Sequence, residues 1–191
     1  MESIIRPALV LFAALTLICG MLYPLAMTGI GQLAFPGKTA GSLIIHDGHA
    51  IGSKLIGQAF TSSNYFWGRP SATSPMPNNA AASSGSNLGP SNPALINAVI
   101  NRIDALKAAD PGNTSAIPVD LVTASASGLD PEISLAAAYY QAPRVARERH
   151  LSIEAVRNLI DQHSESQYFG FLGEPRVNVL MLNLALDKQN E

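Results

Sequence analysis

Hydrophobic positions are spread unevenly along the chain, and their longest run lies near the N-terminus. Between Arg6 and Lys38 no residue is charged, and residues 7–29 read PALVLFAALTLICGMLYPLAMTG. A helix of this length is long enough to cross a hydrocarbon core of about 30 Å. The run therefore predicts a transmembrane helix over residues 7–29, with Pro24 kinking or ending it in its last third.

The same run leaves alternatives open. A cleaved signal peptide also has an apolar core, but that core is only about 7–15 residues long, and no clean small-x-small cleavage site follows here. Thr16 and Gly20 have the spacing of a contact with another membrane helix, or they belong to a lone anchor. Because Arg6 precedes the run, the positive-inside rule predicts that residues 1–6 are cytoplasmic and that residues 34–191 form a soluble domain outside.

The first polar–apolar alternation after the run predicts a β-hairpin between Gly41 and Gly57. Ser42–Ile45 and Ala50–Ile56 are rich in β-prone residues, and Asp47-Gly48 between them is a strong two-residue turn signal. Residues 60–93 that follow are dominated by Ser, Asn, Pro and Gly, which is loop composition. Aromatic residues at their start indicate an ordered irregular segment packed on a surface.

Helical spacing dominates the remainder of the chain. Asn92-Pro93 has the order of a cap and a first-turn residue, and six apolar residues spaced by three and four follow it before Asp110-Pro111-Gly112. The remaining elements are predicted as a short strand, a helix interrupted by Pro143, a further helix, and an apolar segment ambiguous between strand and helix. Their ranges are Val119–Val122, Asp130–Tyr140 with Arg144–His150, Ser152–His163 and Val177–Leu186. The sum is an α+β fold: one N-terminal transmembrane helix and a single helix-rich α+β extracytoplasmic domain.

Composition changes this picture in two ways. Charged residues make up only 14% of the chain, whereas soluble domains average about 25%, and the deficit persists after the apolar run is set aside. The domain surface is therefore covered by small polar side chains or by another protein. The net charge of −2 gives no basic footprint for nucleic acid. Cys19 is the one cysteine, which excludes an intrachain disulfide.

Candidate chemistry is sparse. Gly37-Lys38-Thr39 has the end of a phosphate-binding loop but lacks its first glycine and follows an apolar helix instead of a strand. His46 and His49 flank the hairpin turn, but two histidines without a third ligand make a poor zinc site. No Gly-x-Ser-x-Gly, Ser-x-x-Lys or Asp-Lys-Thr-Gly-Thr motif occurs. The residues therefore favour a membrane-anchored protein without an evident active site over a stand-alone anchored enzyme.

Several segments are distinctive when taken together and in order. They are Arg6–Leu9, Tyr23–Leu25, Gly52–Gln58, Tyr65–Thr73, Ser84–Leu88, Val122–Asp130, Pro143–Ala146 and Leu184–Asp187. On these motifs, and over essentially its whole length, the chain resembles the C subunit of the bacterial Kdp potassium-transporting P-type ATPase.

The resemblance implies a non-catalytic accessory subunit of an ATP-driven, high-affinity potassium import complex in the bacterial inner membrane. Its implied partners are a channel-like A subunit that selects the ion, a P-type ATPase B subunit and a small F peptide. The family is described as a catalytic chaperone that assists assembly and raises the ATP affinity or turnover of the B subunit. No tightly bound cofactor is implied, and ATP is expected only at the interface with the ATPase subunit.

The implied role conflicts with the expected orientation if the domain binds ATP directly, because ATP is cytoplasmic and residues 34–191 are expected in the periplasm. Ser84-Gly85-Ser86 and Ser125–Gly128 are only loose approximations of the ABC-transporter signature that the nucleotide proposal invokes. We therefore expect the effect on ATP to pass through subunit contacts. The alternative is a directly ATP-binding regulatory subunit with a cytoplasmic domain.

The expected partner surface consists of two loops and one basic residue. Aromatic and arginine side chains are the commonest interface hot spots, which favours the loops Tyr65–Thr73 and Ser84–Leu88. The basic cluster of Arg144, Arg147 and Arg149 is interpreted first as a solvated face paired with acidic neighbours, and second as a contact patch. The candidate interface residues are Tyr65, Phe66, Trp67, Arg69, Pro70, Gly85, Asn87 and Arg144.

Overall fold

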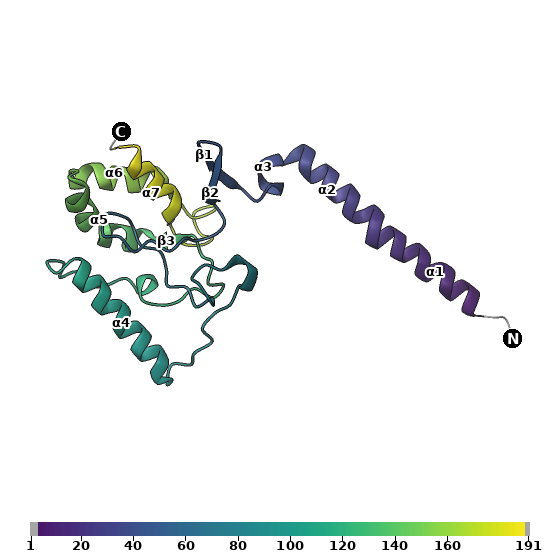
Figure 1. Cartoon of the computed structure of the whole chain (residues 1–191), viewed down its shortest axis with the longest axis horizontal. Helices are drawn as coiled ribbons and strands as arrows, with labels where there is room; N and C mark the ends of the chain where they lie inside the picture. Colours follow the sequence, from purple (N-terminus) through teal and green to yellow (C-terminus); the bar gives the residue numbers. More distant parts are fainter. Residues whose placement is uncertain (1–3, 190–191) are drawn as a thin grey trace. The chain divides into compact units, whose positions relative to one another are not determined.

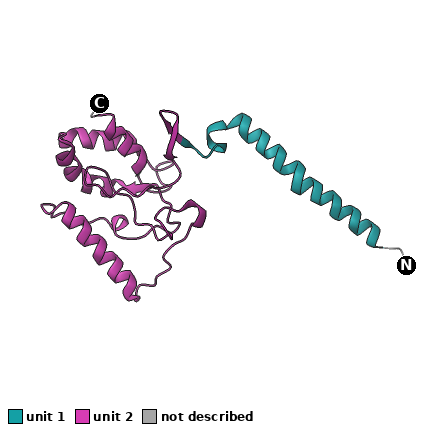
Figure 2. Cartoon of the chain, viewed as in Figure 1, with its two compact units in different colours: residues 1–43 teal, residues 44–191 magenta. Residues whose placement is uncertain are grey.

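The computed structural model of the chain describes residues 4–189 and divides the chain into two compact units. Unit 1 is Met1–Leu43 and unit 2 is Ile44–Glu191 (Figure 2). Each unit is described by itself below.

Unit 1 is almost entirely helical. The α-helix α1 (Ile5–Leu17), the π-helical turn η1 (Ile18–Leu22) and the α-helix α2 (Tyr23–Ala34) follow without a break, and the short helix α3 (Pro36–Thr39) comes next. Among the described residues, only the helix over Ile5–Ala34 is long and apolar enough to cross a membrane, and none of its side chains is buried. This agrees with the predicted anchor and extends its helix at both ends.

The predicted interruption at Pro24 takes the form of the π-helical turn. Proline has no N–H for the carbonyl four residues earlier, and its ring crowds that carbonyl in an α-helix. The wider π-helical turn Ile18–Leu22 ends two residues before Pro24 and allows the helix to continue. Pro24 therefore occupies the first turn of α2 instead of ending the helix.

The predicted hairpin is confirmed. Strand β1 (Leu43–His46) begins at the last residue of unit 1 and pairs with β2 (His49–Ser53). Asp47 and Gly48 both have positive φ angles, 48° and 78°. Two left-handed residues in a two-residue connection fit the twist of the flanking strands, which is the reason that Asp-Gly predicts this turn.

The core of unit 2 is a small antiparallel sheet covered by helices. Strands β3 (Glu132–Ser134), β4 (Ser164–Glu165) and β5 (Arg176–Asn178) have the order β3-β5-β4. The helices α5 (Leu135–Arg149), α6 (Ile153–His163) and α7 (Val179–Asp187) pack against β5, and α6 also packs against α5 and α7 (Figure 1). The buried pair Ile133–Val177 joins β3 to β5 in the centre of this core.

Two sequence predictions in this core need correction, and one open alternative is resolved. The predicted helix at Asp130 begins only at Leu135, because Glu132–Ser134 pairs with β5 and Ser134 caps the helix through the N–H of Ala137. The helix continues through Pro143, whose ring is on the exposed side. The ambiguous segment is β5 followed by helix, since Asn178 caps α7 through the N–H of Met181. The predicted helix capped by Ser152 is confirmed as α6.

The helix α4 (Pro93–Ala109) is confirmed, including its Asn92 cap, but its environment was not anticipated. Figure 1 shows it apart from α5, α6 and α7. Of its predicted apolar stripe only Leu106 is buried, while Ile96 and Ile100 are 51% and 48% exposed. The apolar stripe therefore predicted the helix correctly, but within the described residues most of the stripe is not covered by another element.

The remaining short elements lie in irregular segments. The 3-10 turn η2 (Ala80–Ala82) follows the side-chain cap of Asn79. The strand predicted over residues 119–122 is wrong, because Val119–Leu121 is the 3-10 turn η3. There the carboxylate of Asp120 accepts from the N–H of Ser134 at 2.8 Å, which joins η3 to the start of α5.

Candidate partner-binding site

Three irregular segments of unit 2 meet in space, and we call them together the loop platform: residues 68–73, 84–88 and 122–130. Their backbones are joined directly. The N–H of Ser125 donates to the carbonyl of Pro70 at 3.0 Å. Segments that are more than fifty residues apart in the sequence therefore form one surface.

Further hydrogen bonds hold the loop platform in one conformation. The N–H of Ser84 donates to the carbonyl of Ser127 at 3.0 Å. The hydroxyl of Ser71 donates to the carbonyl of Gly128 at 2.7 Å. Backbone hydrogen bonds and the hydroxyl of Ser71 thus take the place of a sheet ladder between these loops.

Glycines let these backbones approach closely. A Cβ on Gly85 would lie 2.7 Å from the carbonyl oxygen of Ala126, and one on Gly57 would lie 2.6 Å from that of Asp130. Gly128 has a positive φ of 68°, and a Cβ there would meet the carbonyl oxygen of Ser84 at 2.7 Å. The surface is thus assembled by backbone packing that excludes any larger residue at these positions.

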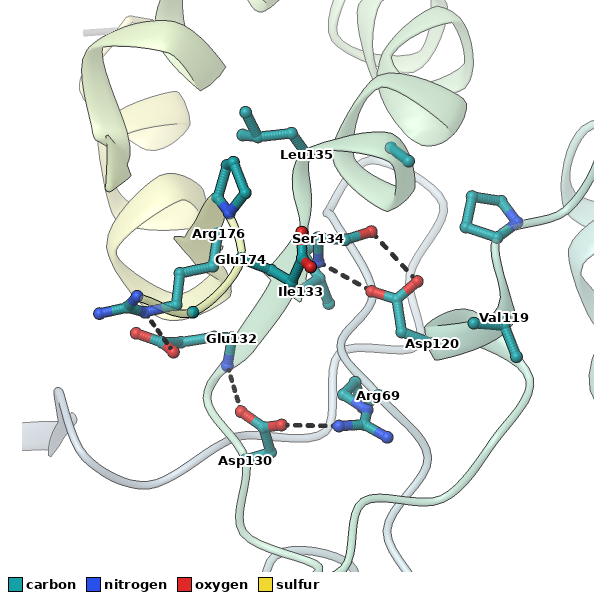
Figure 3. A pocket seen from close by; sticks show the side chains of 14 residues that line it. Arg69, Val119, Asp120, Asp130, Glu132, Ile133, Ser134, Leu135, Glu174 and Arg176 are labelled. Atoms are coloured by element: carbon teal, nitrogen blue, oxygen red, sulfur yellow. Dashed lines mark hydrogen bonds and ion pairs between the residues drawn. The ribbon is translucent and has the colours of Figure 1, made fainter. Parts of the chain in front are cut away.

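A cavity of about 880 Å³, which we call the acidic groove, lies beside the loop platform (Figure 3). Arg69 and Asp130 of the platform lie along it with η3, β3, the start of α5 and the segment that precedes β5. Ile133, Leu135 and Pro175 give it an apolar lining. Its size and lining suit a side chain or a short segment of a partner.

The charged groups of the acidic groove are largely paired with one another. Arg69 Nη1 lies 3.0 Å from Asp130 Oδ2, and Arg176 Nε lies 2.8 Å from Glu132 Oε2 (Figure 3). The hydrogen bond to Glu132 raises the pKa of Arg176 above its ordinary value, with a further contribution from Tyr168. Paired and partly exposed charges orient a partner more effectively than they add affinity.

A second cavity of about 360 Å³, the platform–α4 groove, lies on another part of the loop platform. Its lining includes Ser86 and Leu88 from the platform and Leu95 from α4. Arg102 bridges the two sides, because its Nη2 donates to the carbonyl of Gly68 and its Nε to that of Leu121, both at 3.1 Å. Burial lowers the pKa of Arg102.

The aromatic segment before the platform is held inside the core by two buried side-chain amides. Asn183 accepts from the N–H of Phe66 at 2.9 Å and donates to its carbonyl at 3.0 Å. Gln141 does the same for Trp67, at 2.8 and 3.1 Å. Each amide thus replaces a neighbouring strand, which satisfies backbone groups that burial would otherwise leave unpaired.

Arg144 completes this arrangement from α5. Its guanidinium lies 4.8 Å from the centroid of the Trp67 ring, and it donates to Gln141 Oε1 at 2.8 Å and to the carbonyl of Tyr65 at 3.1 Å. It also hydrogen-bonds the carbonyl of Ser63. Burial lowers the pKa of Arg144 to about 10, opposed by Asp110 and Glu148, so the group keeps its charge at neutral pH.

The structure separates the eight candidate interface residues into two groups. Phe66, Trp67 and Arg144 are at most 7% exposed and are covered by the chain itself. The expectation of a solvated arginine face is therefore wrong for Arg144 and for Arg149, whose side chain is 6% exposed and paired with Asp187. It holds for Arg147, which is exposed and paired with Glu148. The others are partly or fully exposed on or beside the loop platform: Tyr65, Arg69, Pro70, Gly85 and Asn87. For all eight, contact with a partner stays a prediction.

Sequence reasoning missed most of the acidic groove and one exposed segment. The groove depends on Glu132 and Ile133 being strand residues. The sequence around them has the acidic pattern of a helix start, so a strand was not predicted there. The exposed segment is Tyr168–Leu172, whose four apolar side chains are 48–88% exposed. The signal that could have found it is the uncharged stretch between Glu165 and Glu174.

The histidines lie away from the loop platform, on the hairpin and at helix ends. His46 is paired with its neighbour Asp47 at 3.6 Å, and His163 Nδ1 is 3.0 Å from the carbonyl of Leu159 in its own helix. His150 ends α5 in a left-handed conformation. Among the described residues, no group of three or more His, Cys, Asp or Glu side chains is placed to hold a metal ion.

Comparisons with known proteins agree over the full length of the chain. Residues 5–188 match the family model described as KdpC, K+-transporting ATPase, c chain. A protein of Janthinobacterium sp. (strain Marseille) is 71% identical over 189 residues, which cover 99% of this chain and 100% of the relative. One of Herminiimonas arsenicoxydans is 70% identical over 190 residues, with full coverage of both. Each relative is named potassium-transporting ATPase KdpC subunit.

Proposed function

The chain belongs to the KdpC family, the c chains of K+-transporting ATPases, and on that basis we propose that it is a non-catalytic accessory subunit that stabilises the pump and promotes ATP use through subunit contacts. The resemblance found in the sequence motifs is thereby confirmed at the level of the family. The proposed partners are the channel-like A subunit, the P-type ATPase B subunit and the small F peptide.

The loop platform is the observation that carries this proposal. Its backbone is fixed by hydrogen bonds and by closely packed glycines, and a groove lies on each of two parts of it. A rigid, largely preformed surface loses little conformational entropy when a partner binds. The low charge content of the domain supports the same interpretation, because charged residues are depleted at the centres of interfaces.

Direct binding of ATP is less well supported. The acidic groove is lined by four carboxylates and two guanidiniums: Asp120, Asp130, Glu132, Glu174, Arg69 and Arg176. This excess of negative over positive side chains repels a triphosphate. Contact with the ATPase subunit can raise its ATP affinity only if that contact differs between the nucleotide-bound and nucleotide-free states, and ATP must then tighten subunit association by the same factor.

A charge placed in each groove tests the platform as the partner surface. Val119→Asp alters the rim of the acidic groove, where Val119 is 70% exposed, and Ser86→Asp alters the platform–α4 groove. We expect both variants to fold and to co-purify fewer A and B subunits. The matched control is Leu55→Asp, whose side chain is 61% exposed and outside both grooves. Unchanged complex yield and potassium-stimulated ATPase activity in both groove variants would contradict the proposal.

The side of the membrane on which the soluble domain lies decides between the proposed accessory role and the alternative of direct ATP binding. Because Arg6 precedes the apolar helix, we propose a cytoplasmic N-terminus and a periplasmic domain. Gly112→Cys in a Cys19→Ser background places the one thiol in an exposed turn, where a Cβ meets no atom within 4 Å. We expect an impermeant thiol reagent to label this variant in spheroplasts with intact inner membranes. Labelling only after those membranes are opened would favour a cytoplasmic domain that can reach ATP.

A further inference from the structure

The connection between β4 and β5 carries a closed aromatic turn, which we call the aromatic tip: Tyr168–Leu172. The N–H of each end residue donates to the carbonyl of the other, both at 2.9 Å. Phe169 and Gly170 have positive φ angles of 53° and 78°. A phenylalanine rarely adopts this conformation, because its Cβ crowds the backbone, so the tip holds strain in order to keep its shape.

The strained turn exposes large apolar side chains. Phe169 is 88% exposed, Phe171 is 73% exposed and Leu172 is 48% exposed. No charged residue occurs between Glu165 and Glu174. Phenylalanine and leucine at this exposure, next to one another, form an apolar patch that water solvates poorly.

Polar contacts hold the base of the aromatic tip. The guanidinium of Arg176 lies 5.3 Å from the centroid of the Tyr168 ring and forms ion pairs with Glu165 and Glu132, both at 2.8 Å. Gln167 donates to the carbonyl of Gly173 at 2.8 Å. The tip is therefore a supported projection with charged groups at its base and apolar groups at its end.

The chemistry of the tip favours lipid over a protein surface. Protein interfaces contain about one hydrogen bond per 100–200 Å², but the side chains of Phe169, Gly170, Phe171 and Leu172 cannot form any. The N–H and carbonyl groups of the two end residues already bond to each other, which lowers the cost of moving the tip out of water. Aromatic side chains concentrate where hydrocarbon meets water, and arginine is suited to the headgroup level above it.

The anchor keeps a bilayer within reach of unit 2. The apolar helix ends at Ala34 and unit 2 begins at Ile44. The ten residue steps from Ala34 to Ile44 span at most about 36 Å when fully extended. This tether limits the distance between the first residue of unit 2 and the end of the anchor, and a weak lipid contact made by the tip is favoured by the resulting high effective concentration.

We propose that the aromatic tip inserts into the acyl–headgroup boundary of the membrane and forms a second membrane contact, which limits the orientation of unit 2. Phe169 and Phe171 enter the hydrocarbon, while Tyr168 and Arg176 lie at the headgroups. The inference does not depend on which side of the membrane holds unit 2, and it stands or fails separately from the accessory role.

Bromolipid quenching of an introduced indole tests the insertion. The chain has one tryptophan, Trp67, which is 7% exposed and gives the background. Phe169→Trp and Phe171→Trp each place a reporter in the aromatic tip, and Met76→Trp places one at a position that is 59% exposed elsewhere. Each full-length variant is reconstituted in phosphatidylcholine vesicles with and without bromine on the acyl chains.

We expect brominated lipid to reduce the emission of both tip variants well beyond the parent chain, and to leave Met76→Trp at the parent level. Water-soluble acrylamide should show the opposite order. Equal emission of both tip variants in the two kinds of vesicle, with full acrylamide quenching, would overturn the proposal. Circular dichroism melting of each variant against the parent verifies that unit 2 is folded, and the second tip variant keeps the test valid if one is unstable.

Discussion

Two aromatic segments of unit 2 have similar compositions and opposite environments. Tyr65–Arg69 reads YFWGR and Tyr168–Leu172 reads YFGFL. Each begins with a tyrosine that lies against an arginine, at 4.5 Å for Tyr65 and Arg149 and at 5.3 Å for Tyr168 and Arg176. Yet Phe66 is 0% exposed and Phe169 is 88% exposed.

The difference arises from what the backbone of each segment finds to bond with. The first segment is irregular, and it is buried because amides from α5 and α7 take the place of a neighbouring strand. The second segment bonds to itself across a closed turn and needs no neighbour. Aromatic content predicts that a segment takes part in packing or in contact with another molecule. The hydrogen-bond partners of its backbone decide whether the segment is buried in the core or exposed to solvent.

Truncating one phenylalanine in each segment is expected to give the largest contrast. Phe66→Ala should lower the free energy of unfolding of unit 2 by about 3–5 kcal/mol, because it removes a fully buried ring from the core. The matched variant Phe169→Ala should change it by no more than about 0.5 kcal/mol. Denaturant unfolding of the full chain in detergent, followed by near-ultraviolet circular dichroism, measures both. Similar losses in the two variants would remove the contrast.

Removing one amide should have a smaller effect on the same buried segment. Asn183→Leu keeps a similar volume but leaves the N–H and the carbonyl of Phe66 unpaired in the core. Each unsatisfied buried group costs about 1–3 kcal/mol, but burial of the leucine side chain regains about 1.5–3 kcal/mol. A net loss of about 1–3 kcal/mol is therefore expected in the same unfolding measurement. Asn97→Leu on the exposed face of α4 is the control and should be nearly neutral. A neutral Asn183→Leu would show that packing alone holds the segment.

The two tyrosine hydroxyls give the finest comparison. The hydroxyl of Tyr65 lies 3.2 Å from both carboxylate oxygens of Asp187, in a partly buried site. Tyr65→Phe should therefore cost about 1 kcal/mol of unfolding free energy. The hydroxyl of Tyr168 accepts from Arg176 at 3.3 Å in an exposed site, so Tyr168→Phe should have no measurable effect on unfolding. Equal effects would indicate that the tyrosine–arginine pairs of the two segments are equivalent.

The fold was predictable from sequence wherever a local signal acts alone. The Asp47-Gly48 turn, the Asn92 cap and the Ser152 cap each satisfy backbone groups within a few residues, and each predicted its element correctly. Asp130-Pro131-Glu132 also has the pattern of a helix start, but pairing with a strand more than forty residues away overrides it. Tertiary pairing of this kind leaves no mark in the local pattern.

The candidate site was only partly predictable for the same reason. Its segments were found because their motifs are distinctive, and aromatic residues suggested a surface that proved to be core for Phe66 and Trp67. The two amides that cover these residues lie seventy or more positions away, in helices whose polar residues gave no sign of pointing inward. The acidic groove likewise needs four separated stretches of the chain to meet before its lining exists.

The close glycine contacts within the loop platform and against it have a consequence for mutational tolerance. Loops usually accept substitutions, but Gly57, Gly85 and Gly128 each face a carbonyl oxygen less than 3 Å from where a side chain would begin. In a saturation library selected for growth at limiting potassium, these three loop positions should be as depleted of variants as Phe66 in the core. Their exposed neighbour Ser86 has no such restriction from folding, so any depletion there would report the partner surface directly.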